Sequence, residues 1–190
     1  MRTLCAFGVL LALVSLAFAA IDIQNYCGNK VYIRESHNGG CDANPDTGDC
    51  DGDPLTIAPG GQASINTIAD GTGISIKISL DFDFISGILQ FEYAVSDNFY
   101  FDLSDLDGIS GGVVGAPFRS SNVRAVPTGP GAGSGTCKPI LCPADVTCHA
   151  AYQLFDQEAT KGCPDTTVFM DLDLCVAAHD WQKRGVNFTS

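Results

Sequence analysis

Apolar and polar residues alternate with a period of two along much of this chain. In residues 74–80, isoleucines and a leucine alternate with serines and a lysine, and residues 166–174 show a similar alternation. This period is typical of β-strands that bury one face. The predicted strands are residues 21–26, 31–35, 55–58, 63–68, 74–80, 89–95, 99–103, 113–118 and 166–174. Because turn sequences such as Pro59-Gly60-Gly61 separate them, the pattern predicts an all-β sandwich.

One pair of predicted strands carries facing acids. Residues 89–95 and 99–103 flank Ser96-Asp97-Asn98, a spacing that predicts a hairpin with a three-residue loop. In that register Glu92 lies directly opposite Asp102, on the face that points away from the core. Two facing carboxylates repel each other by about 1 kcal/mol in water. The pair is therefore either part of a solvated polar face or a site for a sugar, a cation or acid chemistry.

The second half of the chain changes character. Residues 127–135 (PTGPGAGSG) predict a flexible connector. It leads into a small cysteine-rich lobe, residues 137–163, in which residues 150–155 are the only helix-like stretch. We expect one domain over residues 21–175, which includes this lobe, and a C-terminal tail over residues 176–190.

The first residues predict export. Arg2 precedes an apolar run over residues 4–18, and Ala17-Phe18-Ala19 supplies a cleavage site of small residues. We interpret residues 1–20 as a signal peptide, because the run is short for a membrane span. The mature protein is expected to be secreted, either free outside the cell or associated with the cell wall.

Cysteine usage agrees with export. Removal of the signal peptide removes Cys5 and leaves eight of the nine cysteines. An even number in an exported chain predicts disulfide bonds, and spacing alone leaves their pairing open. A zinc site is disfavoured, because the sequence lacks paired CxxC motifs.

The charge of the chain limits its partners. Ten lysines and arginines against 22 acidic residues give a formal net charge of −12. Such a surface repels nucleic acids and anionic membranes, so neither is expected as a partner. Neutral polysaccharides, cations and basic protein surfaces remain open, and we expect a monomer. In the tail, Asn187-Phe188-Thr189 is an N-glycosylation sequence, and Lys183-Arg184 is a dibasic pair at which a protease could trim the chain.

Four segments occur in an order that resembles a known family. They are IDIQNYCGNKVYIRE, LTIAPGGQASI, LQFEYAVSDNFYFDLSDLDG and CPDTTVFMDLDLC. In this order they are similar to the thaumatin-like proteins, in particular the small secreted fungal members known as antigenic or yeast-phase-specific. The resemblance spans nearly the whole mature chain and implies a thaumatin-like β-sandwich with a small disulfide-rich lobe.

The resemblance also implies a disulfide map and an acidic cleft. The implied disulfides are Cys27–Cys175, Cys41–Cys50, Cys137–Cys163 and Cys142–Cys148. The implied cleft acids are Glu92, Asp102, Asp107 and, as a weaker match, Asp156. Where the family has a cleft arginine, this chain offers only Lys77. It also has fewer cysteines than the plant members, which implies a shallower cleft, so we expect both acids of the facing pair to ionise.

Other chemistry is weaker. Gly108-Ile109-Ser110-Gly111-Gly112 fits the GxSxG hydrolase pattern, but the residues that follow form a poor helix, and that motif needs one. The acidic residues of segment 41–53 have EF-hand-like spacing, but Thr47 stands where glycine is required. A solvated, disulfide-closed loop is therefore favoured over a calcium site. His37, His149 and His179 show no metal-binding spacing. We expect no metal and no other cofactor.

Three functions follow from the resemblance and the acid pair. The leading one is non-enzymatic binding of cell-wall carbohydrate, in particular β-1,3-glucan, with a role in wall remodelling, spore germination or contact with a host. The second is a weak endo-β-1,3-glucanase, with Glu92 as general acid and Asp102 or Asp107 as base or nucleophile. The third is binding of a host surface protein. Exposed rings beside the acids would favour a sugar site, and Tyr100 and Phe169 are the candidates.

Overall fold

The computed structural model describes residues 19–37, 40–106, 117–153 and 158–180. These residues form twelve β-strands. Their bounds are β1 Ala20–Asn25, β2 Val31–His37, β3 Asp42–Ala43, β4 Leu55–Ile57, β5 Gln62–Asn66, β6 Ile74–Ser79, β7 Leu89–Val95, β8 Phe99–Ser104, β9 Asn122–Thr128, β10 Ile140–Cys142, β11 Lys161–Cys163 and β12 Phe169–Val176. Within the described ranges no helix is long and apolar enough to cross a membrane.

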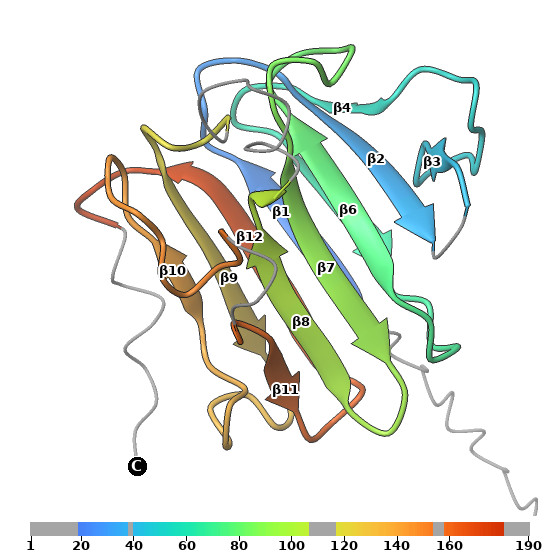
Figure 1. The fold of residues 1–190 in the computed structure, drawn as a ribbon, viewed down its shortest axis with the longest axis vertical. Helices are drawn as coiled ribbons and strands as arrows, with labels where there is room; N and C mark the ends of the chain where they lie inside the picture. The colour runs from blue at the N-terminus through green and yellow to red at the C-terminus, as the bar shows by residue number, and fades with distance from the viewer. Residues whose placement is uncertain (1–18, 38–39, 107–116, 154–157, 181–190) are drawn as a thin grey trace, which may run out of the picture.

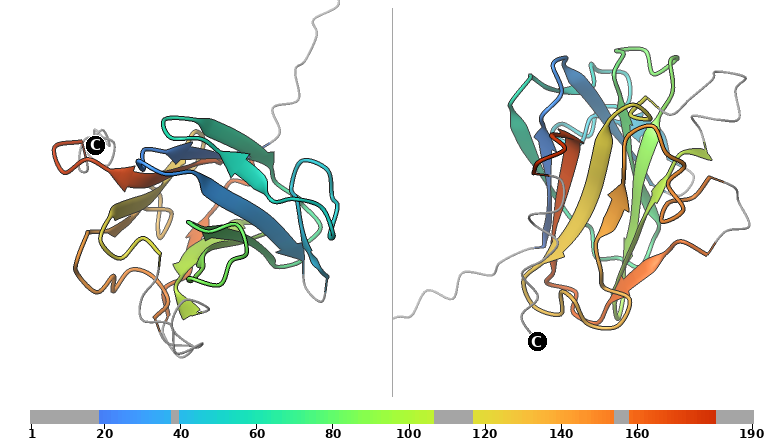
Figure 2. Two further views of the ribbon diagram at one scale, coloured as in Figure 1. Left: turned by 90° about the horizontal axis from the view of Figure 1, so that it is seen from above. Right: turned by 90° about the vertical axis from the view of Figure 1, so that its left-hand side faces the viewer.

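The strands form two sheets that pack face to face (Figures 1 and 2). The first sheet has the order β10-β9-β12-β1-β5, and the second has the order β11-β8-β7-β6-β2-β3, with β4 also pairing with β2. The inward-facing side chains of both sheets make one core, in which Phe91, Phe101 and Met170 are fully buried. The predicted all-β sandwich is confirmed, and the alternation in the sequence marks the inward-facing positions.

The strands β3, β9, β10 and β11 are absent from the sequence prediction. β9 contains Arg124 and Pro127, which weaken its strand signal. β10 pairs only with residues 123–125 of β9. At Pro127 the described sheet therefore has a neighbouring strand on one side alone, which is β12. A proline is tolerated there because it has no N–H to donate to a second neighbour. The predicted connector therefore begins inside a strand. The predicted strand at residues 113–118 falls mainly outside the described residues, and Phe118 lies in a turn.

The predicted helix-like stretch at residues 150–155 is wrong where the structure describes it. Residues 150–153 form a turn, a bend and an isolated bridge. The amide of Tyr152 donates to the carbonyl of Leu103, and Tyr152 pairs with Ser104 at the end of β8. Hydrogen bonds to a neighbouring strand replace those of a helix here, and they fasten the lobe to the second sheet.

Four disulfides join the described cysteines, in the pairs that the resemblance implies. They are Cys27–Cys175, Cys41–Cys50, Cys137–Cys163 and Cys142–Cys148. The first has a sequence separation of 148 and links the segment just after β1 to β12. These two strands are neighbours in the first sheet. The second closes the acidic loop that precedes β4.

Candidate functional site

A groove of about 620 Å³ crosses the outer face of the second sheet. The strand register places one polar residue from each of four strands side by side, because every second residue points outward. This polar row consists of Ser36, Ser75, Glu92 and Asp102. Thr160 extends it, because its hydroxyl donates to Asp102 Oδ2 over 3.2 Å. All five residues line the groove.

The predicted register of the β7–β8 hairpin is confirmed, and Glu92 faces Asp102. Asp102 is only 8% exposed, although it lies on the outer face. Its cover comes from the lobe: Tyr152 docks beside Ser104, and the Tyr152 hydroxyl lies 3.0 Å from Thr160 Oγ1. The lobe thus buries one acid of the pair more deeply than the other.

This burial changes the ionisation of the pair. Burial and the neighbouring Glu92 carboxylate raise the pKa of Asp102 to about 7. Asp102 Oδ1 is buried and receives no hydrogen bond from the described residues. The two carboxyl groups are within hydrogen-bonding range of each other, so one proton held between them removes the repulsion. The expectation that both acids ionise is wrong below neutral pH, because the lobe withholds water from Asp102.

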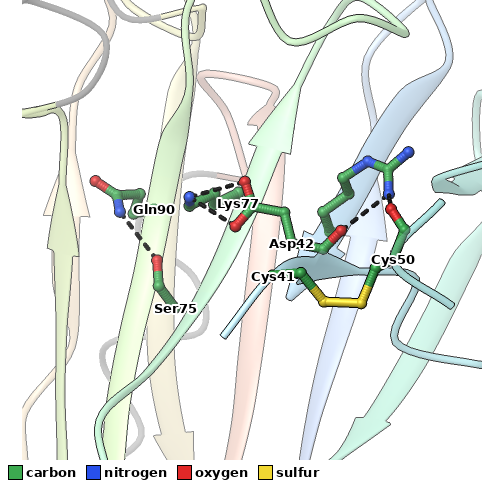
Figure 3. Close-up of polar contacts among 7 residues, drawn as sticks. Cys41, Asp42, Cys50, Ser75, Lys77 and Gln90 are labelled. Carbon is green, nitrogen blue, oxygen red and sulfur yellow. Dashed lines mark hydrogen bonds and ion pairs between the residues drawn. A yellow bond between two sulfur atoms is a disulfide. The ribbon is translucent and has the colours of Figure 1, made fainter. Parts of the chain in front are cut away.

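Lys77 also lines the groove, but its charge is engaged by another acid. Lys77 Nζ contacts both carboxylate oxygens of Asp42, at 2.8 and 2.9 Å (Figure 3). Beside it, the Gln90 amide donates to Ser75 Oγ over 3.0 Å (Figure 3). Lys77 therefore acts as an anchor for the loop that carries Asp42.

That loop, residues 41–53, is held against the sheet by Arg34 of β2. The guanidinium of Arg34 donates to the carbonyls of Asp42, Cys50 and Gly52. Inside the loop, the Asn44 amide donates to the carbonyl of Asp53. Among the described residues no group of three or more His, Cys, Asp or Glu could hold a metal ion. Of the side chains that suggested calcium in the sequence, those of Asp42 and Asn44 make contacts that hold and shape the loop.

Tyr100 presents a ring beside the acid pair. It lies two residues from Asp102 on the same face of β8, is 38% exposed and lines the groove. Its hydroxyl accepts a hydrogen bond from the Asn98 amide over 3.0 Å. Phe169, the other proposed ring, lies on β12 in the first sheet. The prediction that Phe169 stands beside the acids is therefore wrong, because its strand belongs to the opposite layer.

His37 lies at one end of the groove. Its Nε2 is 3.1 Å from Oε1 of Glu35, a buried acid whose pKa is raised by burial. The remaining predicted site residues, Asp107, Asp156, Ser110 and Asn187, lie outside the described residues.

Sequence reasoning missed Thr160, Gln90, Ser75 and Asp42 as lining residues. Gln90 and Ser75 share outward positions with Glu92 and Lys77 in the alternating pattern, so the strand period could have identified them. Thr160 gave no local signal, because 58 residues separate it from Asp102.

The groove offers carboxylate acceptors, hydroxyl groups and the exposed ring of Tyr100. Carboxylates, serine and threonine can exchange hydrogen bonds with the hydroxyl groups of a sugar, and an exposed ring can cover the apolar face of a sugar ring.

Similar proteins agree with the fold. A curated relative, the secreted thaumatin-like protein calA of Emericella nidulans, is 33% identical over 122 residues, which are 61% of this chain. The match spans 65% of that relative's length, slightly less than two thirds.

Two solved structures share the architecture. The protein elicitor MoHrip2 from Magnaporthe oryzae has a TM-score of 0.59 and 21% identity, and covers 83% of this chain and 99% of its own. The thaumatin-like xylanase inhibitor TLXI has a TM-score of 0.52 and 12% identity, and covers 82% of this chain and 99% of its own. Both show the thaumatin-like fold.

The disulfides and the secreted relative indicate an extracellular protein. The family model of Bys1, the Blastomyces yeast-phase-specific protein, matches residues 8–176. The chain therefore belongs to the Bys1 family of secreted thaumatin-like proteins.

Proposed function

We propose that this protein binds cell-wall polysaccharide, in particular β-1,3-glucan, in the groove of the second sheet without cleaving it. The observation that supports the proposal is the facing pair of Glu92 and Asp102 inside a groove that also holds the exposed ring of Tyr100. Facing acids are costly on an ordinary strand surface, and sugar hydroxyls relieve that cost by donating hydrogen bonds to both.

The length of the groove suits a chain-like ligand. Its lining residues come from β3, β2, β6, β7 and β8 and from Thr160 beside β11. Strands in a sheet lie about 4.8 Å apart, so a path across these strands is roughly 20 Å long. This is room for several sugar rings, and the polar row gives each ring a hydroxyl or a carboxylate to contact.

The geometry of the pair supports binding over hydrolysis. Glycosidases that use two carboxyl groups hold them about 5 Å apart for retention, or about 6.5–9.5 Å apart for inversion. Here the two acids stand directly opposite each other on neighbouring strands of one sheet face. Glycosidase carboxyl groups flank the glycosidic bond from two sides, so two acids side by side on one surface do not by themselves have the layout of a glucanase.

Binding of a host surface protein is a second candidate, supported by a different feature. The loop between β6 and β7 exposes Phe82 by 46% and Ile85 by 75%. This loop lies at the end of β7 opposite the turn that joins β7 to β8 (Figure 1). Exposed large apolar residues of this kind are typical of protein-binding surfaces.

Retention on washed, insoluble β-1,3-glucan tests the proposal. We expect the wild type to be retained, and we expect Glu92→Gln combined with Asp102→Asn to weaken retention. The control is Asp22→Asn combined with Asp145→Asn, which replaces two exposed carboxyl groups outside the groove and outside the loop between β6 and β7. Equal retention of wild type and acid-pair variant would contradict the groove as binding surface. Loss of retention in Phe82→Ser with Ile85→Ser alone would favour the apolar loop.

A further inference from the structure

We propose that the Cys41–Cys50 disulfide is a site of exchange with small thiols, and that its opening loosens one wall of the groove and weakens ligand binding. The disulfide closes most of the loop of residues 41–53, and Gly40 and Asp42, on either side of Cys41, line the groove. The effect on binding rests on the proposed function, whereas the exchange reaction does not.

This disulfide differs from the other three in its exposure. Cys41 and Cys50 are both exposed. Each of the other disulfides includes at least one buried cysteine, and Cys137–Cys163 is buried at both residues. A thiol has to reach a sulfur atom before it can exchange, and exposed disulfides are accordingly among the labile ones in proteins. Cys41–Cys50 should therefore open first.

Opening of this disulfide should leave the sandwich folded. The bond joins residues with a sequence separation of 9, and the strand inside its loop, β3, has two residues at the edge of the second sheet. Cys27–Cys175, by contrast, has a separation of 148 and ties two strands of the first sheet together. Because a cross-link that closes a short loop restrains the unfolded chain less than one that closes a long loop, its loss acts mainly on the loop itself.

The exchange is a two-electron reaction with two small thiols. The thiolate of the first attacks one sulfur of the disulfide, and the other protein sulfur leaves as a thiolate, which takes up a proton. The second thiol then attacks the mixed disulfide and frees the remaining cysteine. The two small thiols end as one disulfide, and Cys41 and Cys50 each gain one electron and one proton.

The charge of the loop selects the thiol. Residues 41–53 contain five aspartates and no lysine, arginine or histidine. A thiolate that carries further negative charge is repelled from such a loop, whereas an amine on the same small molecule offsets the thiolate charge. The favoured class is therefore small aminothiols.

The disulfide holds together two limbs of the loop that Arg34 contacts separately. One limb contains Asp42 and the other contains Cys50 and Gly52, and the guanidinium donates to a carbonyl of each of these three residues. Since Cys41 directly precedes Asp42, the disulfide fixes Asp42 beside the second limb (Figure 3). Once the disulfide is open, the limbs depend on hydrogen bonds, which break and re-form far more readily than a covalent bond.

This change reaches the groove through Asp42. Its two carboxylate oxygens contact Lys77 Nζ at 2.8 and 2.9 Å, and both residues line the groove (Figure 3). When the loop loosens, Asp42 and Gly40 lose their fixed positions and Lys77 loses a fixed partner. A ligand across the polar row then has to order this wall as it binds, and that ordering reduces affinity.

Timed exposure to a cysteamine–cystamine buffer, followed by alkylation with iodoacetamide and peptide mass spectrometry, tests the exchange site. We expect Cys41 and Cys50 to be reduced about tenfold faster than the other six described cysteines. Hydrogen exchange of the peptide over residues 41–53 should become faster in the same sample, because the amides of Asn44 and Gly48 are hydrogen-bonded inside the loop. Retention on washed β-1,3-glucan should fall about threefold and return after re-oxidation.

Cys41→Ser combined with Cys50→Ser reproduces the open loop without a thiol. We expect this variant to be retained as weakly as the reduced wild type and to be insensitive to cysteamine. A further loss of retention in the variant on cysteamine treatment would place the effect at another disulfide and overturn the proposal. Reduction and re-oxidation of the wild type give the same test without a substitution, so the result does not depend on how well the variant folds.

The outcomes separate this proposal from the proposed function. If Cys41 and Cys50 are reduced no faster than the other cysteines, the exchange site is wrong. If they are reduced first but retention does not change, the link to the groove is wrong. In both cases retention that depends on Glu92 and Asp102 still supports glucan binding. If the oxidised wild type is not retained at all, the proposed function fails, and labelling together with hydrogen exchange decides the exchange site by itself.

Discussion

Carbons Cδ1 and Cε1 of Tyr100 lie 3.4 Å from the position that a Cβ on Gly162 would occupy. The two residues pair across β8 and β11, and the ring of Tyr100 lies over the bare glycine. Gly162 is itself held by Thr136, which accepts from its amide over 3.0 Å and donates to its carbonyl over 3.2 Å. Because Gly162 has no side chain, the ring of Tyr100 can lie close to the backbone of β11.

The first prediction follows from this contact. A methyl group at residue 162 would just touch the ring, so Gly162→Ala should bind glucan oligomers as the wild type does. Gly162→Val adds branches that the ring must avoid, and it should weaken binding about as much as Tyr100→Ala. We expect a loss of about 1 kcal/mol, or about fivefold in affinity, measured by titration calorimetry. Full binding by Tyr100→Ala would show that the ring takes no part.

The second prediction concerns pH and stability. The pKa of Asp102 is raised in the folded protein to about 7, above its value in the unfolded chain. Between about pH 4 and pH 7 the folded state therefore holds a proton that the unfolded state has lost, and stability falls as the pH rises through this window. The Asp102→Asn variant should lack this loss of stability with rising pH. At pH 8 its free energy of unfolding should exceed that of the wild type by on the order of 2 kcal/mol.

Urea unfolding at pH 5 and pH 8 measures this difference. Glu35 and Asp105 also have raised pKa values, chiefly because they are buried, and they contribute a residual slope in the same direction that the variant retains. An identical pH dependence in wild type and Asp102→Asn would contradict a shared proton at the acid pair.

The third prediction concerns a buried ion pair far from the groove. Arg124 Nε lies 2.7 Å from Asp173 Oδ2, both side chains are almost fully buried, and Arg124 also donates to the carbonyl of Asp180. Asp173→Ala should lower the free energy of unfolding by about 3–5 kcal/mol, because it leaves a buried guanidinium without its counter-charge. Replacing both partners, by Arg124→Met and Asp173→Leu, should lower the free energy of unfolding by less than Asp173→Ala does.

This variant pair has a second use. The ion pair lies in the first sheet, so sugar binding by the folded fraction should be unchanged. If the double replacement lowers the free energy of unfolding as much as Asp173→Ala does, the loss comes from packing and not from the buried charge of Arg124.

The fourth prediction ranks the disulfides. In the chain-entropy model, the stabilisation rises with the length of the loop that is closed. Cys27–Cys175 closes a loop with a sequence separation of 148, and Cys142–Cys148 one of 6. Replacing the first pair by alanines should cost about 5 kcal/mol and the second about 2 kcal/mol. Non-reducing peptide mapping checks the pairing, and recovery of Cys27 bonded to a lobe cysteine would contradict it.

The fifth prediction is the absence of hydrolysis. Incubation of the purified protein with laminarin at mildly acidic to neutral pH should yield no new reducing ends, because Glu92 and Asp102 stand side by side on one sheet face and do not flank a glycosidic bond from two sides. Sustained release of reducing ends that disappears in Glu92→Gln would instead establish an enzyme.

The sequence by itself determined the features that depend on local pattern. The period-two alternation predicted most of the strands, and the three-residue loop of the hairpin was enough to place Glu92 opposite Asp102. The strands and the facing pair follow from the strand period and from turn length, which act over a few residues. Lys77 was placed near the acids by the resemblance alone, as the residue that stands where the family has a cleft arginine.

Only the tertiary structure decided the properties that depend on distant segments. Thr160 and Tyr152 cover Asp102 from the lobe, and this cover raises the pKa of an acid that the sequence led us to expect as ionised. Asp42 takes up the charge of Lys77 from 35 residues away. Phe169 and Tyr100 looked equivalent in the sequence and lie on opposite sheets. Burial and electrostatic pairing depend on which segments meet in space, so the pattern along the chain could predict the facing acids but not the environment that sets their charge.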